Sequence, residues 1–167
     1  MQSIRSKIFA AALLVPFGLA TAPAQAADIV ETAAANPDFT ILVKMINAAG
    51  LAETLKGPGP FTVFAPSDAA FAKWPKKEVE LFLNPAKKEH LVRLLKHHVV
   101  PGKVMAADLK GKKTDAKTVE GTMVKVDAMG DVMVDGNKVV KADIVADNGV
   151  IHVIDTPLLP EKYRGSF

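Results

Sequence analysis

The chain has 167 residues, with 21 Lys and Arg against 18 Asp and Glu, a formal net charge of +3, and no cysteine. Without cysteine, neither a disulfide scaffold nor a lipid-modified cysteine is possible, so a hydrophobic core must hold the fold together. Aromatic residues make up only 6%, and no basic stripe carries interleaved aromatic rings, which argues against a nucleic-acid-binding surface.

The first 26 residues are typical of an export signal. Arg5 and Lys7 form a short basic region, residues 8–19 are largely apolar, and residues 24–26 (AQA) supply the small side chains that a signal peptidase requires. The apolar run is too short and interrupted for a transmembrane helix, which needs roughly 20 apolar residues, and we expect no membrane span elsewhere. We predict a signal peptide over residues 1–26, a single domain over residues 27–160 and a short tail over residues 161–167.

Removal of the predicted signal changes the charge and sets the size of the product. Arg5 and Lys7 leave with it, so Lys and Arg fall from 21 to 19 against 18 acidic residues, a formal charge of about +1. The remaining 141 residues (167 minus 26) can bury roughly two thirds of their unfolded surface in one core. We therefore expect one exported domain, either periplasmic or extracellular.

Helical patterns fill the first part of this predicted domain. Apolar residues recur at helical spacing over residues 39–49, and Gly50 suits the left-handed conformation that ends a helix. Asp28, Ser67 and Asn84 each suit the N-cap position, where a short polar side chain accepts free amide groups. The sequence predicts helices over residues 28–35, 39–49, 51–56, 67–74 and 76–83, and another from residue 84 to about residue 98.

Strand patterns interrupt the helices once and then take over. Residues 61–65 (FTVFA) form the first predicted core strand, which Pro66 ends. From about residue 112 short β-rich runs alternate with turns rich in Gly, Asn and Asp, which predicts a meander. The predicted strands cover residues 122–126, 132–134, 139–145 and 150–154. Helices followed by strands indicate an α+β domain.

Three segments carry a resemblance to a known family. Residues 59–71 (GPFTVFAPSDAAF), 94–102 (LLKHHVVPG) and 148–159 (NGVIHVIDTPLL) resemble, in order and spacing, signature segments of the fasciclin domain family. The resemblance covers about residues 28–160 and implies a β-sandwich wedge flanked by several helices, mainly in the amino-terminal half. It also implies a non-catalytic adhesion or matrix-contact module of the exported, single-domain bacterial type, with no cofactor.

Two departures limit what the resemblance carries over. Relatives commonly have a Tyr-His pair before the Val-Val-Pro-Gly turn, whereas this chain has His97-His98. Animal relatives engage integrins through an Asp-Ile pair near the last segment or through an Arg-Gly-Asp tripeptide. Here Asp155 is followed by Thr156, and the tail reads Arg-Gly-Ser at residues 164–166. Integrin binding is therefore not expected.

The histidines do not have the spacing of a metal site. His90 and His97 lie seven residues apart on one helical face, about 10 Å along the axis, which is too far to share one ion directly. His98 falls on the apolar face of its helix and is expected to be a core histidine bonded to the backbone. His152 lies in a strand and suits either a buried polar position or a surface one. We predict no metal site.

The sequence contains the residue types of a Ser-His-Asp hydrolytic site but not the turn motif that presents the nucleophile. Ser67 could combine with His98 or His152 and with Asp68 or Asp155, yet no Gly-x-Ser-x-Gly elbow is present. Ser67 fits a helix cap better than a nucleophile, and Asp155 fits a turn better than a general base. The sequence therefore predicts that the protein is not an enzyme.

The sequence predicts that the protein is an adhesion or binding module that contacts a protein or polysaccharide at a cell surface, matrix or envelope. The alternative is a carrier of an apolar small molecule such as a carotenoid, held in a groove that sequence cannot distinguish from core. We expect exposed patches near the first and last signature segments and the His97-His98 turn. The candidate contact residues are His97, His98, Asp68, Asp155 and Thr156. A lysine-rich region is expected to be an ordinary solvated surface; if it is functional, its partner would be an anionic surface, either acidic polysaccharide or lipid headgroups. It comprises Lys103, Lys110, Lys112, Lys113 and Lys117.

Overall fold

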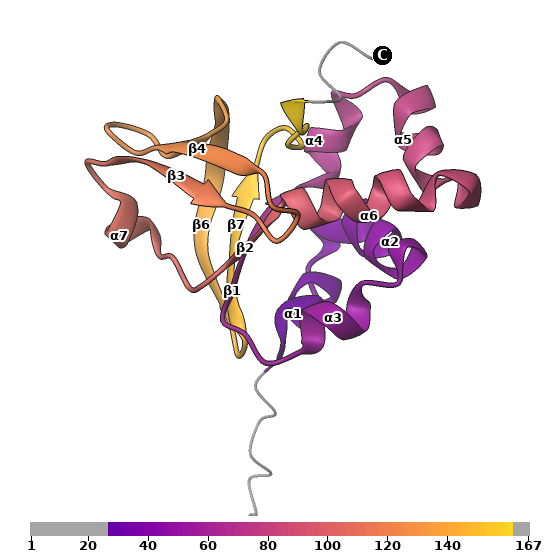
Figure 1. Cartoon of the computed structure of the whole chain (residues 1–167), viewed down its shortest axis with the longest axis horizontal. Helices are drawn as coiled ribbons and strands as arrows, with labels where there is room; N and C mark the ends of the chain where they lie inside the picture. The colour runs from indigo at the N-terminus through magenta and orange to yellow at the C-terminus, as the bar shows by residue number, and fades with distance from the viewer. Residues whose placement is uncertain (1–26, 162–167) are drawn as a thin grey trace, which may run out of the picture.

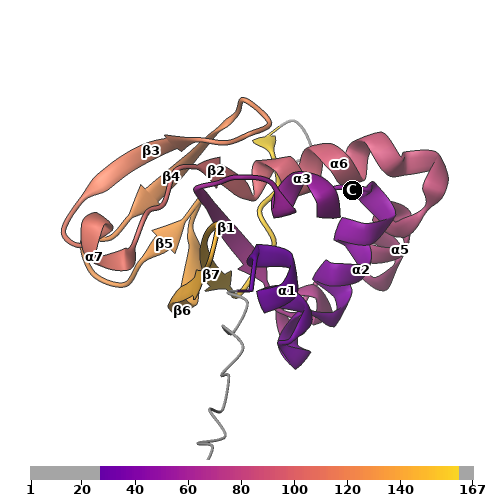
Figure 2. The same ribbon diagram turned by 90° about the horizontal axis from the view of Figure 1, so that it is seen from below.

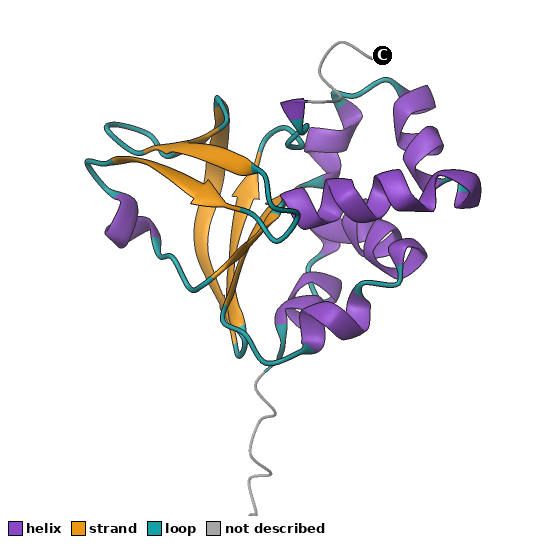
Figure 3. Cartoon of the chain, viewed as in Figure 1, coloured by secondary structure: helices purple, strands orange, loops and turns teal. Residues whose placement is uncertain are grey.

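The structure of the protein, a computed structural model, describes residues 27–161, so the predicted signal peptide and residues 162–167 lie outside the described residues. Most helices gather on one side and the strands on the other, where the short helix Ala106–Leu109 also lies (Figure 3). The helical elements are α1 (Ile29–Ala34), η1 (Pro37–Phe39), α2 (Thr40–Ala49), α3 (Ala52–Lys56), α4 (Asp68–Ala72), α5 (Lys76–Leu83), η2 (Pro85–Lys87), α6 (Lys88–His97) and α7 (Ala106–Leu109). Among them, none is long and apolar enough to cross a bilayer.

The predicted caps set the helix boundaries. The Asp28 carboxylate accepts the Glu31 amide at 2.8 Å, and the Ser67 hydroxyl accepts the Ala70 amide at 3.2 Å. Gly50 ends α2 with φ of 73°, as predicted. Asn84 caps the short 3₁₀ turn η2, and α6 follows directly from it. The helix predicted over residues 67–74 is shorter in the structure and ends at Ala72.

In the part of the chain that the structure describes, seven strands form one sheet in the order β2-β1-β7-β6-β5-β4-β3. The strands are β1 (Phe61–Pro66), β2 (Val99–Pro101), β3 (Lys113–Lys117), β4 (Met123–Asp127), β5 (Met133–Val134), β6 (Asn137–Ala146) and β7 (Gly149–Ile154). Strands β3 to β7 form an antiparallel meander, which confirms that prediction. The first strand, β1, joins it beside β7 in parallel register. The sequence analysis did not identify β2, β3 or α7.

The central strands β1 and β7 have apolar residues on both faces. On one face Val63 and Ile151 pack into a core shared with the helices. On the other face Phe64 and Ile154 pack into a second core shared with β4 and β5. Figures 1 and 2 show the two layers from perpendicular directions, with β1 and β7 between the helices and the β3–β4 hairpin. The α+β sandwich wedge flanked by helices is therefore confirmed.

The turn between β6 and β7 fastens three parts of the chain together. The Asn148 side-chain oxygen accepts the Ile29 amide at 2.9 Å, and its amide group donates to the carbonyl oxygens of Leu55 at 2.6 Å and Gly57 at 3.0 Å. Gly149 follows in close approach to β1, where an added Cβ would collide with the carbonyl group of Phe61. These contacts join α1 and α3 to the sheet.

Candidate functional site

The buried side chain of His98 links α6 to the last signature segment through two hydrogen bonds. Its Nδ1 donates to the Leu94 carbonyl at 2.7 Å, and its Nε2 accepts the Leu158 amide at 2.8 Å. These partners require a neutral ring with the proton on Nδ1. Burial lowers the pKa of His98 to about 4, and the charge of neighbouring His97 acts in the same direction. The predicted core histidine bonded to backbone is confirmed.

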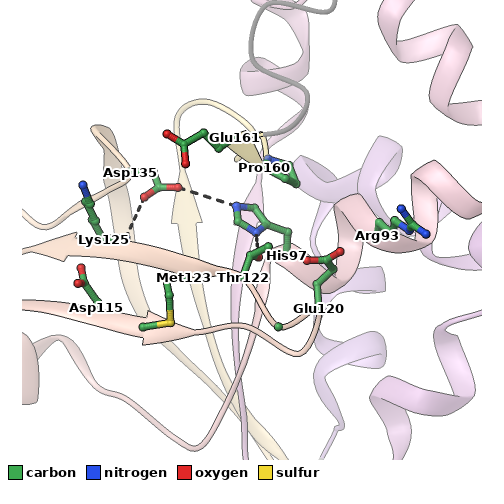
Figure 4. A pocket seen from close by; sticks show the side chains of 11 residues that line it. Arg93, His97, Asp115, Glu120, Thr122, Met123, Lys125, Asp135, Pro160 and Glu161 are labelled. Carbon is green, nitrogen blue, oxygen red and sulfur yellow. Dashed lines mark hydrogen bonds and ion pairs between the residues drawn. The ribbon is translucent and has the colours of Figure 1, made fainter.

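His97 is also an interior residue, with only 2% of its side chain exposed. Its Nδ1 is hydrogen-bonded to the Thr122 hydroxyl, and its Nε2 lies 3.8 Å from a carboxylate oxygen of Asp135 (Figure 4). The expectation of an exposed patch at the His97-His98 turn is wrong, because both rings are buried. Segments 25 and 38 residues further along the chain cover His97, which a local pattern does not reveal.

A polar hollow of about 480 Å³ opens beside His97. Asp135 anchors its wall, since its Oδ1 accepts the Lys125 amide at 2.8 Å while its Oδ2 faces the imidazole. Arg93 and Glu120 line the side nearest α6 (Figure 4). Sequence analysis missed this hollow because α6, β3, β4 and the turn after β5 each contribute to it. Within residues 27–161, no three His, Cys, Asp or Glu side chains are arranged to hold a metal ion.

His152 takes the buried one of its two expected positions. Its Nε2 donates to the Val104 carbonyl at 2.7 Å, and its Nδ1 accepts the Asp143 amide at 3.3 Å. The ring also stacks on Phe64, with a centroid separation of 5.7 Å. His152 therefore joins β7 to β6 and to the segment before α7, and both ring nitrogens are engaged with backbone groups.

The remaining hydrolytic candidates also serve the fold. Asp68 accepts the Ile41 amide at 2.8 Å and so ties α4 to the start of α2. Asp155 accepts the Lys138 amide at 3.1 Å and pairs with Lys73 at 3.2 Å, and the half-buried Thr156 follows it. Since Ser67 is a helix cap and the ring nitrogens of His98 and His152 are occupied, these residues do not form a nucleophile with its base.

The lysine-rich region carries carboxylates among its cations. Lys113 on β3 pairs with Asp127 on β4 at 2.8 Å, and Asp115 stands directly opposite Lys125. Lys103, Lys110, Lys112 and Lys117 are exposed. The outer face of the β3–β4 hairpin is thus a mixed pattern of charges, so a uniformly anionic surface would meet repulsion as well as attraction there.

An apolar cavity of about 290 Å³ lies on the inner side of the same hairpin. Phe64 of β1 and Val100 of β2 line one side, Ala116 of β3 and Val126 of β4 line the other, and Leu109 of α7 lies against it. Four strands and a short helix contribute one or two residues each. This cavity could not be predicted from local sequence patterns, because its lining residues are spread over more than 60 positions of the chain.

Comparison with known proteins agrees with this geometry. Residues 37–160 match the Fasciclin domain. Protein sll1483 of Synechocystis sp. is 47% identical over 132 residues, which are 79% of this chain and 73% of that protein. The transforming growth factor-beta-induced protein ig-h3 of Sus scrofa is 38% identical over 123 residues, which are 73% of this chain and 18% of that protein.

A solved structure shares the fold. It is the FAS1 domain pair from the insect cell adhesion molecule Fasciclin I, with a TM-score of 0.72 at 20% sequence identity. The match covers 81% of this chain and 52% of the solved chain, so the present chain spans about half of that pair. The family match and the identity to the Synechocystis protein establish the relationship that the three signature segments indicated. The chain belongs to the fasciclin domain family.

Proposed function

We propose that this protein is an exported, non-catalytic binding module that contacts a protein or polysaccharide at a cell surface, matrix or envelope. Residues 1–26 direct its export, and residues 27–160 form the binding domain. Family membership supports this proposal, and one solved relative is described as a cell adhesion molecule.

The observation that carries the proposal is that the polar side chains of the signature segments are hydrogen-bonded to backbone groups of the fold. Both ring nitrogens of His98 and of His152 are bonded to backbone groups, and Asp68 and Asp155 accept backbone amides. Side chains held in this way position the scaffold and are not available as acids, bases or nucleophiles. Contact surfaces are then what the domain offers to other molecules.

Binding should be measurable with the mature protein. Residues 27–167 are incubated with cells of the producing organism and with its purified envelope polysaccharide, and retention is compared with that of an unrelated exported protein of similar size and charge. We expect retention about tenfold above this control. Retention equal to the control on both materials would contradict the proposal.

The apolar cavity is the observation that favours the second candidate, a carrier of an apolar small molecule such as a carotenoid. Its volume of about 290 Å³ lies at the lower end of the range of roughly 300–1,000 Å³ typical of ligand pockets. A long polyene would have to extend beyond it. If the carrier function holds, protein purified from its native source shows a visible absorption band, and colourless protein from that source argues against it.

A further inference from the structure

The strand β3 is an edge strand of the sheet, and some of its backbone amide and carbonyl groups point away from its neighbour β4. Within residues 27–161 it pairs with β4 alone. The backbone bonds from Ala128 N to Lys112 O and from Thr118 N to Thr122 O, both 2.8 Å, fix the phase of that pairing. Hydrogen-bonded and non-bonded pairs alternate in an antiparallel ladder. The amide and carbonyl groups of Thr114 therefore face β4, and those of Lys113 and Asp115 point outward.

The apolar cavity lies between the two edge strands, with Val100 of β2 on one side and Ala116 of β3 on the other, and the space between these strands is called the wedge. Just beyond the end of β3, the Val119 amide donates to the Val99 carbonyl of β2 at 2.8 Å, so the chain leaving β3 meets β2 there. From that point β2 and β3 diverge, and α7 lies on the connection between their far ends (Figure 1). The side chains of Thr114 and Ala116 line the cavity within this wedge.

We propose that this wedge is the partner-binding site, and that it accepts an extended segment of another protein as an added strand beside Lys113 and Asp115. The segment's alternate side chains enter the apolar cavity. This inference rests on the proposed binding function and specifies its partner. Strand addition to an exposed edge gains affinity from main-chain hydrogen bonds and specificity from pockets for alternate side chains, and the wedge offers both.

The charges of β3 define the chemistry of the added segment. Lys113, Asp115 and Lys117 project from the outer face of the sheet, while Thr114 and Ala116 face the cavity. Residues directly opposite each other in a ladder lie on the same face, and opposite charges there are favourable. The complementary segment therefore reads acidic, apolar, basic, apolar, acidic, a pattern that is the same in both chain directions.

Two other occupants fit the wedge less well. A polysaccharide does not present the regular backbone donors and acceptors that match Lys113 and Asp115. A second copy of this chain, paired antiparallel along all five residues of β3, would place Lys113 opposite Lys117 and Asp115 opposite itself. Like charges directly opposite each other destabilise a sheet.

The test uses the mature protein and a capped peptide of sequence SEVKVES, with the charge-reversed peptide SKVEVKS as control. Amide hydrogen exchange is followed by NMR. At saturating SEVKVES we expect the Lys113 and Asp115 amides to exchange about fivefold more slowly. The amides of Thr114 and Ala116, already directed at β4, serve as internal controls and should not change. An unchanged Lys113 or Asp115 amide, or equal slowing by both peptides, would overturn the inference.

A pair of variants separates the backbone contact from the side chain. Asp115→Pro removes the outward amide without removing a bond to β4, because edge positions of this kind tolerate proline. Asp115→Ala removes the same carboxylate but keeps the amide. We expect SEVKVES to bind Asp115→Pro about tenfold more weakly than Asp115→Ala, with thermal unfolding reporting that both variants are folded. Equal affinities of the two variants for SEVKVES would contradict the proposal that the peptide adds to β3 as a strand.

The same variants keep this inference distinct from the proposed function. If the unmodified protein is retained on cells or envelope polysaccharide and Asp115→Pro is retained equally, the binding function stands and the β3 site is wrong. If the unmodified protein is retained and Asp115→Pro is not, the result supports both the proposed binding function and the β3 site. No retention of the unmodified protein contradicts the proposed function, whatever the peptide does. Concentration-dependent dimerisation abolished only in Asp115→Pro would assign the edge to a second copy and overturn the partner named here.

Discussion

Replacing His98 by Ala is expected to lower the free energy of unfolding by about 4 kcal/mol. The change removes the acceptor for the Leu158 amide and the donor for the Leu94 carbonyl, and it leaves a space at a site where His98 is 3% exposed. Denaturant unfolding of residues 27–167 at pH 7.5 measures the loss. Lys96→Ala, at a half-buried position of the same helix, is the matched control and should cost about 0.5 kcal/mol. A similar loss for both variants would show that the hydrogen bonds of His98 to Leu94 and Leu158 do not contribute this stability.

Acid should destabilise the protein through the same residue. The folded state holds the pKa of His98 at about 4, below its ordinary value of 6.5, so the unfolded chain binds the proton first as the pH falls. The stability that the neutral ring contributes is fully present above pH 6.5 and is lost progressively as the pH falls from 6.5 to about 4. Over that range the loss amounts to about 3 kcal/mol.

His98→Gln isolates this contribution, because the amide does not titrate. The unfolding free energy is measured between pH 7.5 and pH 4 for the unmodified protein and for the variant. We expect the variant to be less stable at pH 7.5 but to lose about 3 kcal/mol less on acidification. Parallel curves for the two proteins would show that His98 is not the acid-sensitive group.

Local signals explain why most of the fold could be predicted. The caps at Asp28, Ser67 and Asn84 each bond an amide two or three residues away, and Gly50 ends α2 through its own backbone conformation. Features of this kind are visible in a window of a few residues. His98 was assigned correctly for the same reason, since helical spacing alone placed it on the apolar face of α6.

The parts that were missed depend on distant partners or on weak patterns. His97 has the same spacing signal as a surface residue, and its burial results from Thr122 and Asp135, which cover it from the turn before β4 and the turn after β5. The strand β3 (KTDAK) lacks β-branched apolar residues, and of its five residues only Ala116 is half-buried while the others are exposed. An edge strand needs little apolar character, and so its sequence resembles a loop.

Asn148, in the last signature segment, should be nearly as sensitive as His98. Asn148→Ala is expected to lower the free energy of unfolding by about 3 kcal/mol, because the backbone groups of Ile29, Leu55 and Gly57 lose their partner. The loss should concentrate on the junction between α1, α3 and the sheet. Hydrogen exchange of the Ile29 amide, compared with that of amides in α6, would report it.

Asn148→Asp distinguishes the donor from the acceptor. The carboxylate still accepts the Ile29 amide, but it places a second oxygen against the carbonyl groups of Leu55 and Gly57, so we expect a loss at pH 7 of about 3 kcal/mol or more. Protonation below the pKa of the new carboxyl restores one donor and should recover part of the loss. Asn47→Ala, an exposed position on α2, is the neutral control. If Asn148→Asp were as stable as the unmodified protein, the two carbonyl bonds would not hold α3 to the sheet.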